Sequence, residues 1–203
     1  MVIPKSYEKV KLKNIASIRL GYPFRTKIER NPEGTVGVIQ MKDIDDYNCL
    51  DLSDVYKVQL DDAEKHLLHQ HDILFCSRGV SKTTALVTED IKPYVAALSL
   101  MVIRVKSKKV DPAYLVSYLN QPYGQYQISR ISEGTSLSMV SKSALENLVI
   151  NLPSLEKQKL IAEISALSQR EQQIMEKLAQ KRKLYIDTIL MRKAVNTKHL
   201  KQK

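Results

Sequence analysis

Features that would place the chain in a membrane or in an oxidising compartment are missing from the sequence. No apolar run approaches the roughly 20 residues of a transmembrane helix, and the N-terminal segment MVIPKSYEKVKLKN has no apolar stretch typical of a signal peptide. The two cysteines, Cys49 and Cys76, form no C-x-x-C pair, which indicates reduced thiols in the core. We therefore expect a cytoplasmic protein without a membrane partner.

The chain is long enough for one domain and an appendage, and its composition is that of an ordinary folded protein. Of its 203 residues, 43% are hydrophobic and 27% are charged, so global disorder is not expected. The net charge of +10 is uneven: the segment from Glu176 onward holds nine Lys/Arg and two acidic residues, which leaves 23 basic and 20 acidic residues before it. Such a basic end is typical of a solvated tail or of a nucleic-acid contact, and charge alone does not decide between them.

Up to Pro153 the sequence mixes short apolar runs with turn signals, which indicates strands interrupted by short helices. One helix is predicted from its cap at Asp111, with Pro112 at the first position, to its end before Pro122, and a second follows Ser141. The expected strands lie in residues 36–44, 72–77, 95–107 (one or two strands) and 146–153. The pattern predicts an α+β fold with a largely antiparallel sheet over residues 1–153.

After Pro153 the residue composition changes. The sequence has neither glycine nor proline for about forty residues and consists of good helix formers. It predicts one long helix over residues 154–194, roughly 60 Å in length, followed by a basic tail at 195–203. Positions that alternate by four and three residues form a heptad seam typical of a coiled coil. The seam consists of Leu160, Ile164, Leu167, Glu171, Ile174, Leu178, Lys181, Tyr185 and Thr188.

The two charged seam positions indicate how this helix pairs. In an antiparallel pair centred near Glu176, Glu171 of one helix faces Lys181 of the other, and Ile174 faces Leu178. A charge buried without a partner is very costly, so this register removes the main defect of the seam. We therefore predict an antiparallel two-helix coil, with a second copy or with another protein's helix. The alternative is a single amphipathic helix that lies on its own domain.

The stretch ILFCSRGVSKTT (residues 73–84) ends in letters close to those of a nucleotide-binding P-loop. A P-loop requires G-x-x-x-x-G-K-[ST] followed by a helix, because its glycines let backbone amides surround the phosphates. Here Cys76 and Ser81 occupy the two glycine positions, and a β-like segment containing Pro93 follows. The stretch is therefore predicted to be a β-hairpin with a polar tip.

Several segments, taken in order, resemble the DNA specificity (S) subunit of type I restriction-modification systems. They are KVKLKNIASIRLGYPFR near the start, IQMKDI (39–44), HDILFCSRG (71–79) and, most specifically, SEGTSLSMVSKSALENLVINLPSLEKQKLIAEI (132–164). The resemblance covers nearly the whole chain and rests mainly on the order of its elements. Departures from the family pattern are Tyr7 where Trp is common, His71 for the Gly of GDIL, and Ser154 for a frequent Pro.

The resemblance implies a globular target recognition domain that reads one half of a bipartite site in double-stranded DNA. It also implies a long helix that acts as a spacer and docks methyltransferase (M) subunits, with a restriction (R) subunit as a further candidate partner. Complete subunits have two such domains and two helices, whereas this chain has one of each. We therefore expect a half-subunit that forms a homodimer through antiparallel helices and reads two identical half-sites.

The chain itself is expected to be non-catalytic, with methylation and cleavage supplied by partner subunits. The segment NQPYGQY (120–126) does not match the Asn-Pro-Pro-Tyr type motif of methyltransferases, no nucleophile–base set has motif support, and no cofactor is indicated. The alternative function is a coiled-coil adaptor or regulatory protein, derived from such a subunit, that binds protein and no longer reads DNA.

Candidate DNA contacts are side chains whose chemistry suits phosphates and base edges, which Arg, Lys, Gln, Ser and Thr can reach. They are Arg25, Thr26, Lys27, Gln40, Lys42, Arg78, Ser81, Lys82, Thr83, Thr84, Thr135, Ser136, Ser138 and Lys142. An alternative is a metal site at His66, His69 and His71 with Glu64 and Asp72 nearby. Exposed or capping histidines are the preferred interpretation, so no metal is expected.

Overall fold

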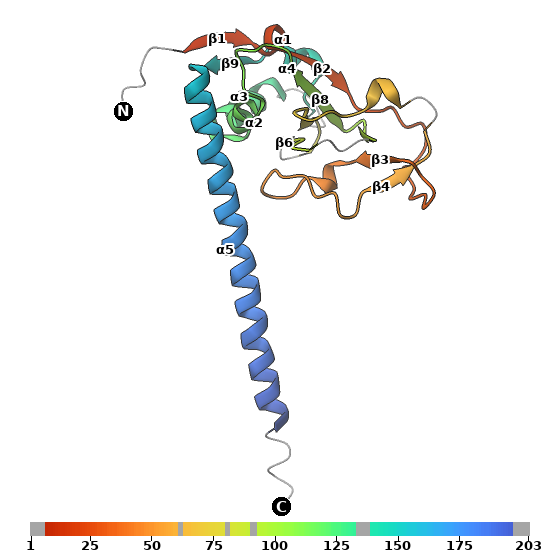
Figure 1. The fold of residues 1–203 in the computed structure, drawn as a ribbon, viewed down its shortest axis with the longest axis vertical. Helices are drawn as coiled ribbons and strands as arrows, with labels where there is room; N and C mark the ends of the chain where they lie inside the picture. The colour runs from red at the N-terminus through yellow and green to blue at the C-terminus, as the bar shows by residue number, and fades with distance from the viewer. Residues whose placement is uncertain (1–6, 61–62, 80–81, 90–92, 133–138, 197–203) are drawn as a thin grey trace, which may run out of the picture. The chain divides into compact units, whose positions relative to one another are not determined.

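The computed structural model describes residues 7–60, 63–79, 82–89, 93–132 and 139–196. The chain divides into two compact units, Met1–Glu163 and Ile164–Lys203. The first holds the sheets, the short helices and the first turns of the long helix α5 (Leu155–Asn196), and the rest of α5 belongs to the second (Figure 1). The predicted α+β fold with a long C-terminal helix is confirmed.

In the first unit the strands form three sheets within the described residues. The largest is fully antiparallel, with the order β2 (Ala16–Leu20), β8 (Leu100–Val105), β5 (Ile73–Cys76), β6 (Thr84–Leu86). The second has the order β4 (Tyr56–Val58), β3 (Val36–Ile39), β7 (Tyr94–Ala96), in which β3 and β7 are parallel. The third pairs β1 (Glu8–Lys11) with β9 (Val149–Leu152). The expected mostly antiparallel pairing is therefore correct.

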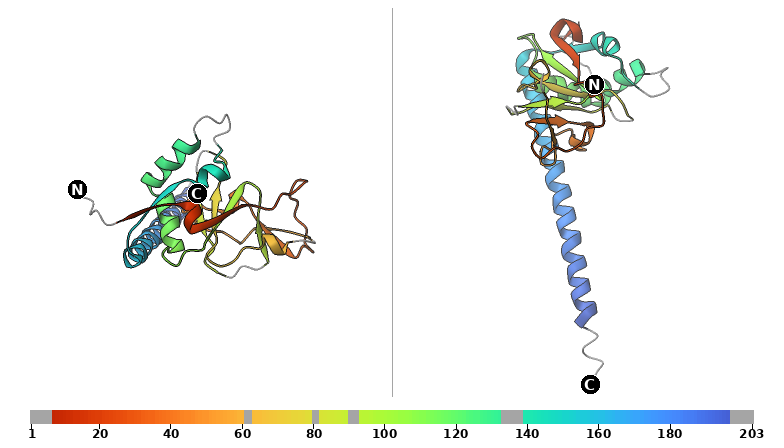
Figure 2. Two further views of the ribbon diagram at one scale, coloured as in Figure 1. Left: turned by 90° about the horizontal axis from the view of Figure 1, so that it is seen from above. Right: turned by 90° about the vertical axis from the view of Figure 1, so that its right-hand side faces the viewer.

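Four short helices pack on one face of the largest sheet. They are α1 (Leu12–Ile15), α2 (Pro112–Asn120), α3 (Pro122–Ser132) and α4 (Lys142–Glu146), and their buried residues share one core with the sheet; Figure 2 gives two further views of the ribbon. Strand β5 explains why the run ILFC lacks alternation: Ile73 and Phe75 join the core under the helices, whereas Leu74 and Cys76 join a second core on the opposite face. A strand buried on both faces reads as a continuous apolar run.

Most predicted elements are found, with corrections at their ends. Asp111 caps α2, its carboxylate accepting a hydrogen bond from the Tyr114 amide at 3.0 Å, and Ser141 caps α4 in the same way. The strand expected over 36–44 ends at Ile39, because the Asp43 carboxylate accepts the Gln40 amide at 2.8 Å and closes a tight 3₁₀ turn. Residues 95–107 hold parts of two strands, β7 and β8. Helix α3, which begins at Pro122, was not predicted.

Helix α5 is 42 residues long and leaves the predicted seam exposed. Leu178 is 59% exposed and Tyr185 68%, since no other described element of the second unit covers them. Within the residues that the structure describes, no helix is both long enough and apolar enough to span a bilayer.

Candidate nucleic-acid interface

Strands β5 and β6 form the predicted β-hairpin, with Ile73 opposite Leu86 and Phe75 opposite Thr84. Their connection, residues 77–83, is called the hairpin loop below; its residues 80–81 lie outside the described residues. A strand follows Lys82 and Thr83 where a P-loop would have a helix. The predicted β-hairpin is therefore found, without the loop-to-helix order of a P-loop in the described residues.

Three predicted contact residues of this hairpin turn inward. The Lys82 side chain is only 5% exposed and its ammonium donates a hydrogen bond to the Gly79 carbonyl, while burial lowers its pKa. The Thr83 hydroxyl donates to the Cys76 sulfur at 3.3 Å. Thr84 is fully buried, and its hydroxyl bonds the Asn120 side chain at 2.9 Å. In this conformation these groups hold the loop in shape.

Arg78 is the exposed cation of the described part of the loop, and the backbone beside it has an unusual conformation. Gly79 has a φ of +92°, a region that side chains with a Cβ rarely adopt. A Cβ placed on Gly79 would lie 3.5 Å from the terminal methyl of Met41. The loop is therefore held against the turn that carries Gln40 and Lys42.

Other segments also meet the hairpin loop. The Val140 amide donates to the Ser77 carbonyl at 3.0 Å, which brings the segment just before α4 to the loop. The Gln125 side chain of α3 donates to the Lys82 carbonyl at 3.1 Å. Segments far apart in sequence thus converge at the end of β5 that carries the loop, as the candidate interface requires.

The two candidates in the turn after β3 have different surroundings. The Gln40 side-chain nitrogen is buried and has no hydrogen-bond partner among the described residues. Lys42 is exposed, but its ammonium lies 3.0 Å from the Asp43 carboxylate and 4.5 Å from the centre of the Tyr56 ring. The hydrogen bond to Asp43 raises the pKa of Lys42. This cation is already engaged within the protein.

The remaining predicted DNA contacts differ in what the structure shows of their surroundings. Arg25, Thr26 and Lys27 are exposed, and their flanking residues Phe24 and Ile28 pack on the core of the β4–β3–β7 sheet. Lys142 is exposed and forms an i,i+4 ion pair with Glu146 at 3.6 Å. The predicted contacts Ser81, Thr135, Ser136 and Ser138 lie outside the described residues.

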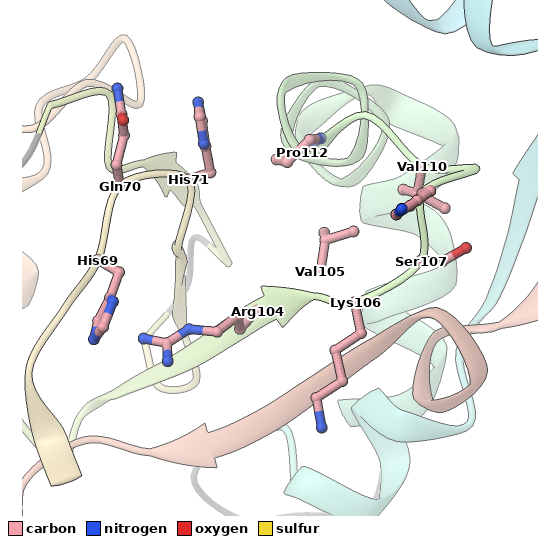
Figure 3. Close-up of a pocket in the computed structure, with 10 residues that line it drawn as sticks. His69, Gln70, His71, Arg104, Val105, Lys106, Ser107, Val110 and Pro112 are labelled. Carbon is pink, nitrogen blue, oxygen red and sulfur yellow. The ribbon is translucent and has the colours of Figure 1, made fainter.

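The histidine-rich turn lies at the other end of β5. Figure 3 shows His69 pointing one way and Gln70 and His71 the other, beside a cavity of about 470 Å³ that the end of β8 also lines. The described residues contain no group of three His, Cys, Asp or Glu side chains that could hold a metal. His71 has a φ of +70°, so the family's glycine position is a left-handed turn in this chain.

Asp72, next in sequence, has a structural role. Its carboxylate is almost fully buried and binds both the Nε and an Nη of Arg104 at 2.6 Å, and it accepts the His69 amide at 2.9 Å. The ion pair is bidentate, and mainly the hydrogen bond to Asp72 raises the pKa of Arg104. The cavity also has Lys106 and Lys108 on its wall.

The chain combines an α+β unit that carries a polar hairpin loop with a long C-terminal helix. A family model described as the type I restriction modification DNA specificity domain matches residues 4–181. The chain therefore belongs to the type I restriction-modification DNA specificity family, and the resemblance inferred from the sequence is confirmed.

Individual relatives agree with this family. A protein of Methanocaldococcus jannaschii, named as the specificity subunit of type I restriction enzyme MjaX, is 26% identical over 179 residues, which are 80% of this chain and 39% of the relative. The HsdS subunit of Thermoanaerobacter tengcongensis has a similar fold, with a TM-score of 0.61 at 18% identity over 84% of this chain and 39% of that one.

Two further solved structures share the fold. The S subunit of a type I system from M. genitalium has a TM-score of 0.58 at 15% identity, over 87% of this chain and 43% of that one. A chain from a study of complex assembly and conformational transition in the type I R-M system has a TM-score of 0.67 at 15% identity, over 93% and 45%. This chain thus spans less than half the length of each of these four relatives.

Proposed function

We propose that the chain is a sequence-specific DNA recognition subunit that reads one half-site per copy. Its helix docks a methyltransferase subunit and, in restricting assemblies, a restriction subunit, and these partners supply the chemistry. The family match over residues 4–181 carries this proposal. Residues 1–153 form the recognition domain, 154–194 the spacer helix and 195–203 a basic tail.

The hairpin loop is the centre of the proposed DNA contact. Arg78 is exposed, and its fork of donors suits the two acceptors on the major-groove edge of guanine. The side-chain nitrogen of Gln40 has no hydrogen-bond partner among the described residues, and the next residue, Met41, lies near Gly79 of the same loop. Lys82, Thr83 and Thr84 are reassigned from DNA contact to support of the loop, because their side chains bond within the protein.

Other predicted residues remain part of the proposed interface. Lys142 lies two residues after Val140, whose amide bonds the Ser77 carbonyl of the loop. Ser81, Thr135, Ser136 and Ser138 are kept as contacts on their sequence alone. Arg25, Thr26 and Lys27 form a separate exposed group that would contact a neighbouring stretch of DNA backbone. Lys42 contributes only if DNA displaces Asp43.

The first experiment compares the wild-type chain with Arg78→Ala, each with the methyltransferase partner, by gel retardation on target and scrambled DNA. Loss of a bidentate base contact is worth about 1–3 kcal/mol, so target affinity should fall roughly 5- to 150-fold while scrambled DNA is bound almost as before. The matched control is the double variant Lys106→Ala, Lys108→Ala, which removes charge at the opposite end of β5 and should leave the preference intact.

If Arg78→Ala keeps full target preference, the hairpin loop is not the reader. If the wild-type complex itself prefers no sequence, the recognition function is wrong. The adaptor function would then be favoured, provided that the chain still binds its protein partners.

We also propose that two copies pair through antiparallel α5 helices, which would fix the distance between two recognition domains. The exposed seam supports this: Leu160, Ile164, Leu167, Ile174, Leu178 and Tyr185 are apolar side chains with more than half of their surface in solvent. In the proposed register, Glu171 of each copy pairs with Lys181 of the other, so two ion pairs flank the centre of the contact. The paired domains would read an interrupted palindrome.

Charge exchange tests this register. Glu171→Lys should weaken the dimer tenfold or more, because each contact then places two lysines opposite each other. Adding Lys181→Glu restores opposite charges and should restore the dimer, as sedimentation equilibrium would show. If neither variant changes the dimer affinity, or if the double variant stays monomeric, the proposed register is wrong.

A further inference from the structure

Helix α3 presents an exposed face that the candidate interface has not used. Its inner side is fixed by Gly124 and Ile128, which are buried, whereas Tyr123, Tyr126 and Arg130 are exposed. The three positions are separated by three and four residues, so they lie on one side of the helix. Tyr126 is 60% exposed and Tyr123 53%. Aromatic rings bury a large apolar area in cores and interfaces, so two exposed rings on one helix face indicate a surface that could contact a partner.

The chemistry of this face suits a polyanion. No Asp or Glu occurs between Asp111 and Glu133, so neither α2 nor α3 carries a negative side chain. Arg130 offers a guanidinium, and Tyr126 offers a ring that can pack on a sugar and a hydroxyl that can donate to a phosphate oxygen. An acidic patch on a partner protein could also bind this positively charged face. The position of α3 in the fold is therefore needed to decide between DNA and such a protein.

The position favours DNA, because α3 is attached to the hairpin loop. Gln125, on the helix between the two tyrosines in sequence, donates to the Lys82 carbonyl of the loop at 3.1 Å and to the Leu119 carbonyl of α2 at 2.7 Å. A Cβ on Gly124 would lie 2.1 Å from the Tyr118 carbonyl, so α3 and α2 approach at backbone distance.

The first residue of β6, directly after the loop, is joined to α2 as well. The Asn120 side chain accepts the Thr84 amide at 2.9 Å and donates to the Thr84 carbonyl at 2.8 Å. Loop and helix are thus held together by side-chain bonds on both sides of Pro122. Because α3 lies beside the loop that carries Arg78, DNA bound at Arg78 would pass close to α3.

We propose that the outer face of α3 is a phosphate-contacting element that positions the DNA backbone while the hairpin loop reads the bases. Arg130 pairs with one phosphate, and Tyr126 packs on the adjoining sugar. The inference rests on the proposed DNA-reading function and adds to it a division of labour between two neighbouring elements.

A salt titration separates backbone contact from base reading. The full chain with its methyltransferase partner would be titrated with labelled target and scrambled duplexes at several salt concentrations, followed by fluorescence anisotropy. Arg130→Ala should weaken both duplexes by the same factor, about 3- to 10-fold, and lower the slope of log affinity against log salt by roughly 0.9, the value for one phosphate. Tyr126→Ala should also weaken both equally, with the slope unchanged.

Two further variants serve as controls. Arg130→Lys keeps the charge and should restore the slope, whereas Lys108→Ala, an exposed cation at the opposite end of β5, should leave both affinity and slope as in the wild type. Because Tyr126 and Arg130 are exposed, the variants should fold, and near-ultraviolet circular dichroism of the tyrosines checks this.

The outcomes distinguish the inference from the function on which it rests. Unchanged affinity and slope in Arg130→Ala and Tyr126→Ala, with a specific wild type, would overturn the role of α3 and leave the reading function standing. Loss of methyltransferase binding in place of DNA binding would make this face a protein-docking surface and overturn the proposal too. A wild type that binds all DNA equally would refute sequence reading, yet the slope of Arg130→Ala would still decide whether α3 contacts phosphate.

Discussion

Gln158 connects the start of α5 to the rest of the first unit, and its replacement is the stability change that the structure predicts most sharply. The side chain is 1% exposed and makes three hydrogen bonds of 2.9 Å. Its oxygen accepts the Asp111 amide, and its nitrogen donates to the carbonyls of Lys109 and Pro153. One amide thus joins the residues before α2 to the residues before α5.

The expected cost follows from those bonds. Each intramolecular hydrogen bond contributes about 0.5–1.5 kcal/mol net, and a buried group left unpaired costs about 1–3 kcal/mol. Gln158→Ala removes three bonds to backbone groups near the surface, some of which water can reach, so the loss should be about 2–4 kcal/mol. Gln158→Glu keeps one acceptor but turns a carboxylate toward two carbonyl oxygens, so it should be at least as damaging at neutral pH.

That second variant also has a signed pH dependence. Burial beside two carbonyls favours the protonated acid and raises the pKa of the introduced Glu in the folded state above its ordinary value of about 4.3. The folded variant then binds more protons than the unfolded chain, so its stability is greatest at low pH and declines as pH rises. Relative to the wild type, Gln158→Glu should therefore recover partly on acidification, whereas Gln158→Ala should not.

Urea unfolding followed by near-ultraviolet circular dichroism measures these differences in the first unit, since every tyrosine except Tyr185 precedes α5. The control is Gln172→Ala, the same substitution at an exposed position of the same helix, with an expected change within about 0.5 kcal/mol. A loss for Gln158→Ala no larger than for this control would show that the three bonds do not hold the unit together.

Two further predictions concern the first unit. His71→Gly should stabilise it by about 0.5–1 kcal/mol, because the left-handed conformation is strained for a residue with a Cβ, and thermal unfolding should show a rise, with His71→Ala giving none. Burial raises the pKa of Tyr114 and of Tyr118 to about 12, so both phenols stay protonated in the folded state where the unfolded chain loses its protons. Stability should therefore fall as pH rises from about 10 toward 12. Tyr114→Phe should flatten that fall, and an identical alkaline decline in this variant would refute the assignment.

The sequence predicted the fold where local signals and packing agree. The cap and proline at Asp111–Pro112 define α2, and the absence of glycine and proline after Pro153 defines α5. It failed at α3, since Pro122 reads equally as the end of one helix and the first residue of the next. The exposed tyrosines and the lone arginine of that helix also give no strong apolar period to read.

The candidate site was predictable only in part, because side-chain type does not reveal burial. Lys82 and Thr84 have the chemistry of DNA contacts, yet they support the loop from inside, through bonds to Gly79 and Asn120. The partner Asn120 lies 36 residues away from Thr84, and no local pattern signals such a contact. Arg78, by contrast, follows the last buried residues of its strand and loop and is exposed, as the hairpin pattern indicates.

The central claim is that two copies read two identical half-sites at a fixed spacing. Methylome sequencing of cells that contain the methyltransferase, with and without this chain, tests it most directly. The account predicts that one methylated motif disappears without the chain, and that this motif consists of two inverted, identical half-sites around a constant number of unspecified bases. An unchanged methylome, or a lost motif that is asymmetric or uninterrupted, would contradict it.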